Sequence, residues 1–172
     1  MTLAQLARRW DRMRLRHGIC LRAIERLPAD HLDAAAIPAM RTPKQLVVHL
    51  YANVLAGMIE GILRGRIEEI DERPIASAIG THAELLRNAD ECFARASRAV
   101  AAFTDDTLAS TVTTPWNYEA RGSSMLGLME EEYLHHRGQL YVYLRALGAA
   151  PPSMWDFANN APAYRPRTDA RA

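Results

Sequence analysis

Apolar residues recur at alternating steps of three and four from the start of the chain to Leu27, and this spacing is the strongest constraint on the fold. The stripe consists of Leu3, Leu6, Trp10, Met13, His17, Cys20, Ile24 and Leu27. Steps of three and four return a side chain to the same face of an α-helix. Pro28 follows the stripe and favours a helix end there. The chain is therefore expected to begin with one long amphipathic helix.

A second helix is predicted to begin after Thr42. Thr42 can cap it, Pro43 suits the first helical position, and Gln45 can reach back to complete a capping box. This helix is expected to run to about Leu63. Residues 66–80 are charged and then contain proline, so they predict a connection with room for one short helical turn.

Thr81 and Glu84 form another capping box, and an apolar seam follows at helical spacing, which predicts a third long helix. Residues 104–123 contain β-prone and turn residues without a helical period. They predict a long ordered loop before the last helix, with room for a short hairpin. Ser124 is expected to cap the last helix, which runs through Leu147 and ends at Gly148.

Four long helices with such connections predict an all-α bundle with one core, over residues 1–157. Residues 158–172 contain proline and arginine and are predicted to form a mobile tail. The formal net charge of +1 gives no field that would attract nucleic acid or anionic lipid, so neither is an expected partner. Cys20 and Cys92 are far apart and are expected to be small core residues. We find no signal peptide and no window close to a membrane span, so a cytoplasmic location is expected.

Two ionisable residues interrupt the apolar face of the last predicted helix. Glu132 and His136 share this face with Met129, Leu140 and Tyr143. Burial of a lone carboxylate costs several kcal/mol, so a core glutamate is expected to be paired, protonated or bound to a cation. A spacing of four lets both side chains reach one ion from adjacent turns.

His49 lies near the middle of the second predicted helix and shares its face with Gln45, Ala52, Asn53 and Ala56. The small neighbours would leave space beside the imidazole. His49, Glu132 and His136 would then form a three-ligand metal site with positions open for water and substrate. Taken singly, His49 is better explained as a core histidine with satisfied hydrogen bonds, and Glu132 as a salt-bridge partner of an arginine.

Two further histidines compete for a role. A helix turns roughly 100° per residue, so His135 and His136 diverge, and we favour His136 as the residue that faces His49. His17 is either a core residue or a hydrogen-bond partner of a ligand.

The chain also resembles a known family. The run from Glu132 to Pro152, EYLHHRGQLYVYLRALGAAPP, is similar to the signature of the DinB/YfiT-like superfamily, in which a helix with His-x-x-x-His-Arg-Gly-Gln ends in Leu-Arg-x-x-Gly-x-x-Pro. The segment TPKQLVVHL from Thr42 to Leu50 is similar to the other ligand-bearing helix of that family. The resemblance covers approximately residues 3–157.

The resemblance implies a four-helix bundle of up-down-down-up type, often a homodimer, with a divalent metal ion held by three histidines. Nickel or zinc is the expected metal, and iron or manganese is an alternative. His49 and His136 match two of the ligands, and Glu132 stands in the place of the third. A glutamate there either still binds the metal, which gives a site of two histidines and one carboxylate, or marks a member that has lost or changed its metal.

The resemblance further implies a metal-dependent enzyme that acts on a small molecule, either a transferase of low-molecular-weight thiols or a hydrolase, and we lean towards thiol transfer. A bound divalent ion would activate a thiol or a water in the same way. We expect the substrate pocket to be shaped by Gln139, Tyr143, Trp116, Tyr118 and His135. The alternative is a non-catalytic metal-binding or stress-response module whose polar cluster is structural. The mixed ligand set also permits an iron-dependent oxygenase.

Overall fold

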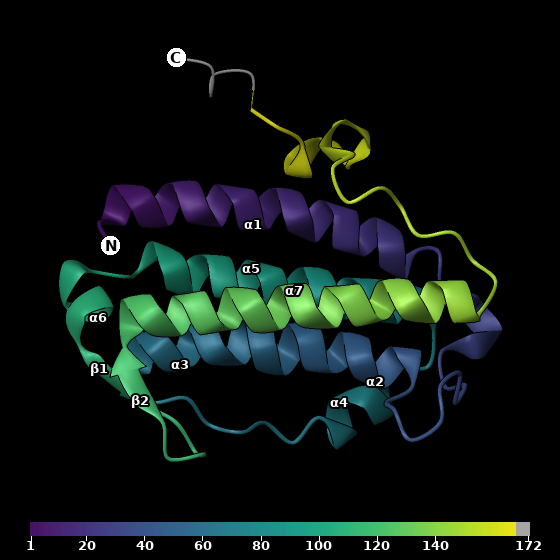
Figure 1. Ribbon diagram of the computed structural model, residues 1–172, viewed down its shortest axis with the longest axis horizontal. Coiled ribbons are helices and arrows are strands. Elements are labelled where there is room, and N and C mark those ends of the chain that lie inside the picture. Colours follow the sequence, from purple (N-terminus) through teal and green to yellow (C-terminus); the bar gives the residue numbers. More distant parts are fainter. Residues whose placement is uncertain (168–172) are drawn as a thin grey trace.

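Four long helical segments lie side by side in the computed structural model, which describes residues 1–167 (Figure 1). The segments are α1 (Leu3–Ile24), a second helix formed by α2 (Pro43–Val48), the π-helix η2 (His49–Gly57) and α3 (Met58–Arg64), then α5 (His82–Ala101) and α7 (Gly122–Ala146). Their apolar faces meet in one hydrophobic core, which includes both cysteines. The prediction of an all-α four-helix bundle is confirmed.

Local hydrogen bonding explains where the helices begin. Thr42 and Thr81 form the predicted capping boxes with Gln45 and Glu84. The predicted start of α7 is wrong, because the helix begins at Gly122 and not after Ser124. The Gly122 N–H donates to the Ser110 carbonyl, and a Cβ atom at this position would stand 2.2 Å from the Thr107 carbonyl oxygen. A close approach of two segments therefore sets this start, and no cap motif in the sequence marks it.

The order of helix directions is up-down-down-up. In Figure 1, α1 and α7 run in one direction, and the second helix and α5 run in the opposite direction. The second helix and α5 are consecutive and parallel, so the chain must return along the length of the bundle between them. Residues 65–81 make this crossover and hold the short helix α4 (Arg73–Ala78), which matches the predicted helical turn. Gly65 ends α3 and begins the crossover, and its φ of 78° lies in the left-handed region.

The segment before α7 was predicted to be a loop with room for a short hairpin. The hairpin is present, and a short helix that was not predicted precedes it. The segment consists of α6 (Asp105–Ala109), β1 (Thr111–Thr113) and β2 (Glu119–Arg121), and the two strands pair antiparallel. Ile67 N–H donates to the Thr113 carbonyl at 2.9 Å, and Thr113 N–H donates to the Gly65 carbonyl at 3.2 Å. The start of the crossover and the hairpin are thereby held together at one end of the bundle.

The prediction that no window comes close to a membrane span is wrong for the second helix. Pro43–Arg64 contains a window with a mean hydropathy of 1.7, which is enough by length and composition to cross a membrane. However, 78% of that window is buried inside the bundle. A helix that is apolar all round is expected at the centre of a core, and this accounts for its composition.

The segment after α7 lies along α1 (Figure 1). It contains two short 3-10 helices, η3 (Phe157–Asn159) and η4 (Pro162–Tyr164). Asn160 is buried and donates from Nδ2 to the Leu15 carbonyl at 2.9 Å. The sequence predicted a mobile tail from residue 158, whereas residues 158–167 are bonded to α1, and residues 168–172 of that tail lie outside the described residues.

Candidate metal centre

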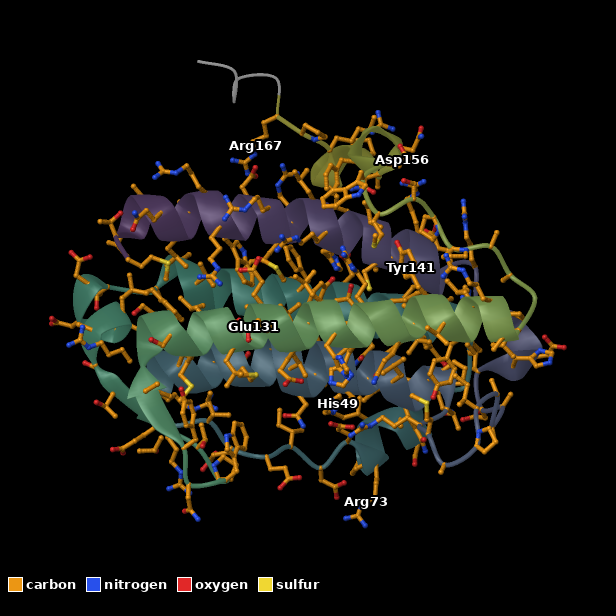
Figure 2. All side chains as sticks on the ribbon, in the orientation of Figure 1. His49, Arg73, Glu131, Tyr141, Asp156 and Arg167 are labelled. Atoms are coloured by element: carbon orange, nitrogen blue, oxygen red, sulfur yellow. The ribbon has the colours of Figure 1, made fainter. Side chains whose placement is uncertain are left out.

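His49 is the first residue of the π-helix in the middle of the second helix, and Figure 2 shows it beside α7, on the side of the bundle where α4 passes. The Met58 N–H donates to the Asn53 carbonyl five residues earlier, which is the hydrogen-bond pattern of a π-helix. Its wider turn changes which residues share a face with His49. Asn53 stays on this face, as predicted, and Val54 and Met58 join it.

The residues predicted to leave room beside His49 are elsewhere. Ala52 and Ala56 are buried in the core and do not border the imidazole on the open side. The prediction was wrong because it assumed 3.6 residues per turn where the chain makes a π-helix. The open space lies instead over Asn53 and Val54.

A cavity of about 300 Å³ lies on this face. Its lining residues come from the second helix, the crossover, the hairpin and α7, and they are His49, Asn53, Val54, Met58, Ile67, Trp116, Leu128 and Glu132. Two of the three predicted metal ligands, His49 and Glu132, therefore line one cavity. It is at the lower end of the size range of small-molecule sites.

Glu72, at the start of α4, holds the far side of the His49 ring. His49 Nδ1 donates to Glu72 Oε1 at 2.5 Å, and Asn53 Nδ2 donates to the same oxygen at 2.9 Å. An ionised carboxylate only accepts hydrogen bonds, so Nδ1 carries a proton, and Nε2 is the ring nitrogen left to bind a metal. Burial opposes the charge on Glu72, but the hydrogen bonds from His49 and Asn53 outweigh burial and lower the pKa of Glu72.

Sequence reasoning missed Glu72. It lies in the crossover, where no helical period directs attention to a single acid among Glu68, Glu69, Asp71 and Glu72. The one available signal was its position just before Arg73-Pro74, since an acidic residue is favoured at the start of a helix. That signal predicts a helix start and not a contact with His49.

His136 approaches His49 from α7. The two ring centroids are 4.6 Å apart and the rings are nearly perpendicular, at 89°. His136 Nδ1 lies 2.8 Å from Gln139 Oε1, to which it can donate, and His136 Nε2 lies 3.4 Å from Glu132 Oε2. Burial is the main cause that lowers the pKa of His136. The neutral imidazole is the form that binds metals, so this environment favours a ligand.

Glu132 is less buried than its position on the helix suggested. Its side chain is 45% exposed, at the edge of the cavity. The buried side of α7 is formed by residues that include Met129, Tyr133 and Leu140. The expectation that burial forces Glu132 to find a cation is therefore wrong, and its case as a ligand depends on its nearness to His136.

The predicted pocket residues separate into two groups. Trp116 lines the cavity, whereas Tyr118, Tyr143, Gln139 and His135 are not among the described residues that do. Gln139 instead lies between the two neighbouring histidines, because its Nε2 is 3.0 Å from His135 Nε2. Tyr143 is buried, and its hydroxyl donates to the Arg41 carbonyl.

His17 is a core residue and lies in a separate buried cluster. Its Nδ1 is 2.9 Å from the Tyr51 hydroxyl and its Nε2 is 3.0 Å from Asp90 Oδ1, and its ring stacks on Phe93. Burial lowers the pKa of His17 despite the nearby carboxylate. The structure thus supports the first of the two roles left open for it.

The three predicted metal ligands lie near one another but do not form a closed coordination sphere. Within residues 1–167, no group of three or more His, Cys, Asp or Glu side chains converges at the distances of a bound ion. The rings of His49 and His136 are perpendicular, the Glu132 carboxylate lies beside His136 Nε2, and the Glu72 carboxylate lies beside His49 Nδ1.

Comparison with known proteins gives one family match and two structural neighbours. Residues 3–167 match the model of the DinB family. The crystal structure of the DinB-like protein YjoA from Bacillus subtilis has a TM-score of 0.65 and 18% identity, covering 81% of this chain and 91% of that chain. YfiT from Bacillus subtilis, described as a probable metal-dependent hydrolase with an unusual four-helix bundle topology, has a TM-score of 0.65 and 20% identity over 83% of this chain and 87% of that chain. No curated protein sequence matches the chain.

Proposed function

Because the chain belongs to the DinB family, we propose that it is a metal-dependent enzyme that holds a divalent cation with His49, His136 and Glu132 and acts on a small molecule. The observation that carries this proposal is the arrangement of the two histidines. Their rings lie 4.6 Å apart, and each has its Nδ1 beside a hydrogen-bond acceptor, Glu72 or Gln139. Histidine ligands of metals typically have their other ring nitrogen held in this way.

The ligand types fit a divalent ion. Two imidazole nitrogens and one carboxylate oxygen suit zinc, nickel, iron or manganese, and three protein ligands leave positions for water and substrate. Glu132 Oε2 lies 3.4 Å from His136 Nε2, and the half-exposed Glu132 side chain has room to rotate when an ion binds between it and the two histidines. The exposure of Glu132 makes that rotation sterically possible.

The chemistry follows from the roles of these residues. A divalent ion bound here would lower the pKa of a bound water or thiol and so supply a nucleophile near neutral pH. Glu72 accepts the hydrogen bond of His49 Nδ1, which leaves Nε2 of that ring for the ion, and Gln139 does the same for His136. Asn53 fixes Glu72 through a second hydrogen bond.

Hydrolysis and thiol transfer are the two candidate reactions. The description of YfiT as a probable metal-dependent hydrolase favours hydrolysis as the better supported of the two. Thiol transfer remains the prediction of the family resemblance. An assay with a model electrophile, with and without a low-molecular-weight thiol, separates them: conjugation that requires both metal and thiol supports transfer, and metal-dependent ester or amide cleavage without thiol supports hydrolysis.

Metal content tests the site directly. We expect wild-type protein purified without chelator to hold about one divalent ion per chain, as a three-ligand site implies. His49→Ala and His136→Ala should lose the ion, and Glu132→Ala should weaken its binding. Glu131→Ala is the matched control, because Glu131 is exposed on the same helix. Elemental analysis measures the content of each variant.

A different result would support the non-catalytic alternative. Wild-type protein that is purified without metal, and whose melting temperature is unchanged by added zinc, nickel, manganese or iron, would contradict the enzyme proposal. Loss of the ion in His49→Ala but full retention in Glu132→Ala would remove Glu132 from the ligand set.

A further inference from the structure

The cavity beside His49 has a polar end and an apolar end. The second helix and α7 run antiparallel (Figure 1). Along the cavity, residue numbers therefore rise from His49 to Met58 on the second helix while they fall from Glu132 to Leu128 on α7. His49, Asn53 and Glu132 lie at the first end. Met58 and Leu128 lie at the second end, towards the hairpin.

The apolar end is bordered by two residues whose backbone segments are hydrogen-bonded to each other. Trp116 comes from the turn between β1 and β2, and Ile67 comes from the start of the crossover. The Ile67 N–H bonds to the Thr113 carbonyl of β1, so the backbones that carry these two side chains are joined. The backbone that leads to Trp116 is thereby held at this end, and its indole borders the cavity while 53% of the residue stays exposed to solvent.

The charged groups that line the cavity are also confined to its polar end. None of the described residues that line the cavity is lysine or arginine, and the one carboxylate is Glu132 at the polar end. A negatively charged group placed at the apolar end would lose its hydration without gaining a partner, which is costly. An uncharged apolar or aromatic group would gain from burial and from contact with the indole.

We propose that this site selects small neutral substrates that present a metal-binding polar group to His49 and Glu132 and an uncharged aromatic or apolar group to Met58, Leu128 and Trp116. This inference rests on the proposed metal-dependent function. The size agrees, because a cavity of about 150 Å³ accommodates benzene, and about 300 Å³ leaves room for one ring and a short functional group. Trp116 is the residue that determines the preference for a ring.

Three hydroxamates test the proposal on zinc-loaded protein. Acetohydroxamate supplies the metal-binding group alone, benzohydroxamate adds a neutral ring, and 4-carboxybenzohydroxamate adds a charge to that ring. By apolar burial alone, benzohydroxamate should bind at least about tenfold more tightly than acetohydroxamate. The carboxylated probe should lose most of this gain. Calorimetry measures each dissociation constant.

Variants locate the effect. Trp116→Ala should reduce the preference for benzohydroxamate by at least about threefold while acetohydroxamate binding stays the same. Trp155→Ala is the matched control, since Trp155 is an exposed tryptophan in the segment after α7, away from the cavity. Equal binding of the two uncharged hydroxamates, or an unchanged preference in Trp116→Ala, would overturn the proposal.

A metal-independent measurement separates this inference from the proposed function. Benzamide and acetamide have no strong metal-binding group, and saturation-transfer NMR on metal-free protein should detect benzamide and lose its signal in Trp116→Ala. If the protein holds no metal but benzamide binds as expected, the enzyme proposal fails and the aromatic subsite stands. If zinc binds but benzamide gives no Trp116-dependent signal and benzohydroxamate shows no advantage, the subsite fails alone.

Discussion

Glu72 accepts a hydrogen bond from His49 Nδ1, which leaves the other ring nitrogen of His49 available to the proposed metal ion. Glu72 is held by Asn53 as well, so its position is fixed by two donors from one helix. Arg41 Nη2 is 3.4 Å from His49 Nδ1, and its charge also helps to lower the pKa of Glu72. The hydrogen bonding of His49 therefore depends on Glu72, a residue of the crossover, which carries no recognisable motif.

Removing the charge of Glu72 should weaken metal binding without removing a proposed ligand. We expect Glu72→Gln to lower zinc affinity by about 10- to 100-fold, the usual effect of losing a partner of a histidine ligand. Glu72→Ala should be at least as severe. Glu69→Gln is the matched control, because Glu69 is an exposed acid in the same crossover. Calorimetric titration with zinc measures the change, and wild-type affinity in Glu72→Gln would contradict the assigned role.

Individual helices were predictable where local hydrogen bonds determine them. The capping boxes at Thr42 and Thr81 identified two starts because the partners are three residues apart in the sequence. The π-helix was not predictable, since the second helix is apolar on nearly every side and its sequence shows no break in period. The start at Gly122 depends on contact with Thr107, which the sequence does not display. The same applies to the contact between Glu72 and His49.

The segment after α7 depends on a glycine in α1. A Cβ atom at Gly18 would lie 2.6 Å from both Asn160 Nδ2 and Tyr164 Cβ, which is too close without a shift of the segment. Gly18→Ala should therefore destabilise the protein by about 1–3 kcal/mol, less the small gain in helix propensity. The melting temperature should fall, and limited proteolysis should cut the segment after Pro152 faster.

The control for this substitution is Gly138→Ala. Gly138 is an exposed helical position in α7, and a Cβ atom there would meet none of the described atoms within 4 Å. Alanine should stabilise the helix by about 0.5–1 kcal/mol. Equal melting temperatures for Gly18→Ala and wild-type protein would show that the segment does not need the close approach.

The whole molecule is held together across its helices by the core and by a few partly buried ion pairs. Glu130 of α7 accepts hydrogen bonds from Arg9 and Arg16 of α1, and its side chain is only 12% exposed. The last segment adds two ion pairs to α1, Asp156 with Arg22 and Arg167 with Asp11, and Figure 2 shows Asp156 and Arg167 beside that helix. The homodimer and the cytoplasmic location remain predictions.

The pH dependence of stability should report the Glu130 contacts. Burial opposes the charge of Glu130, but the hydrogen bonds from Arg16 and Arg9 outweigh it, so its pKa is lowered in the folded protein. A lowered pKa means that the stabilisation is present above the unfolded value of about 4.3 and is lost as the pH falls through the folded value. Glu130→Gln should therefore reduce the free energy of unfolding by about 1–3 kcal/mol at pH 7, with a shrinking difference below about pH 4.

Urea titrations of wild type and Glu130→Gln at several pH values measure this dependence. Glu131→Gln controls for the change in net charge at the neighbouring exposed position. A difference between wild type and Glu130→Gln that stays constant from pH 7 to pH 3 would show that the lost stability is not electrostatic.

The second helix and α5 are parallel, so the chain between them must cross the length of the bundle, and this crossover carries Glu72 to His49. His49, Glu72 and His136 are thus brought together by contacts between residues far apart in the sequence. Chain entropy makes such contacts slow to form. An intermediate in which α7 has not yet docked would have a helical circular dichroism signal but would lack the proposed metal site. The rate at which refolding protein acquires zinc would then report the last assembly step of the bundle, and not the formation of its helices.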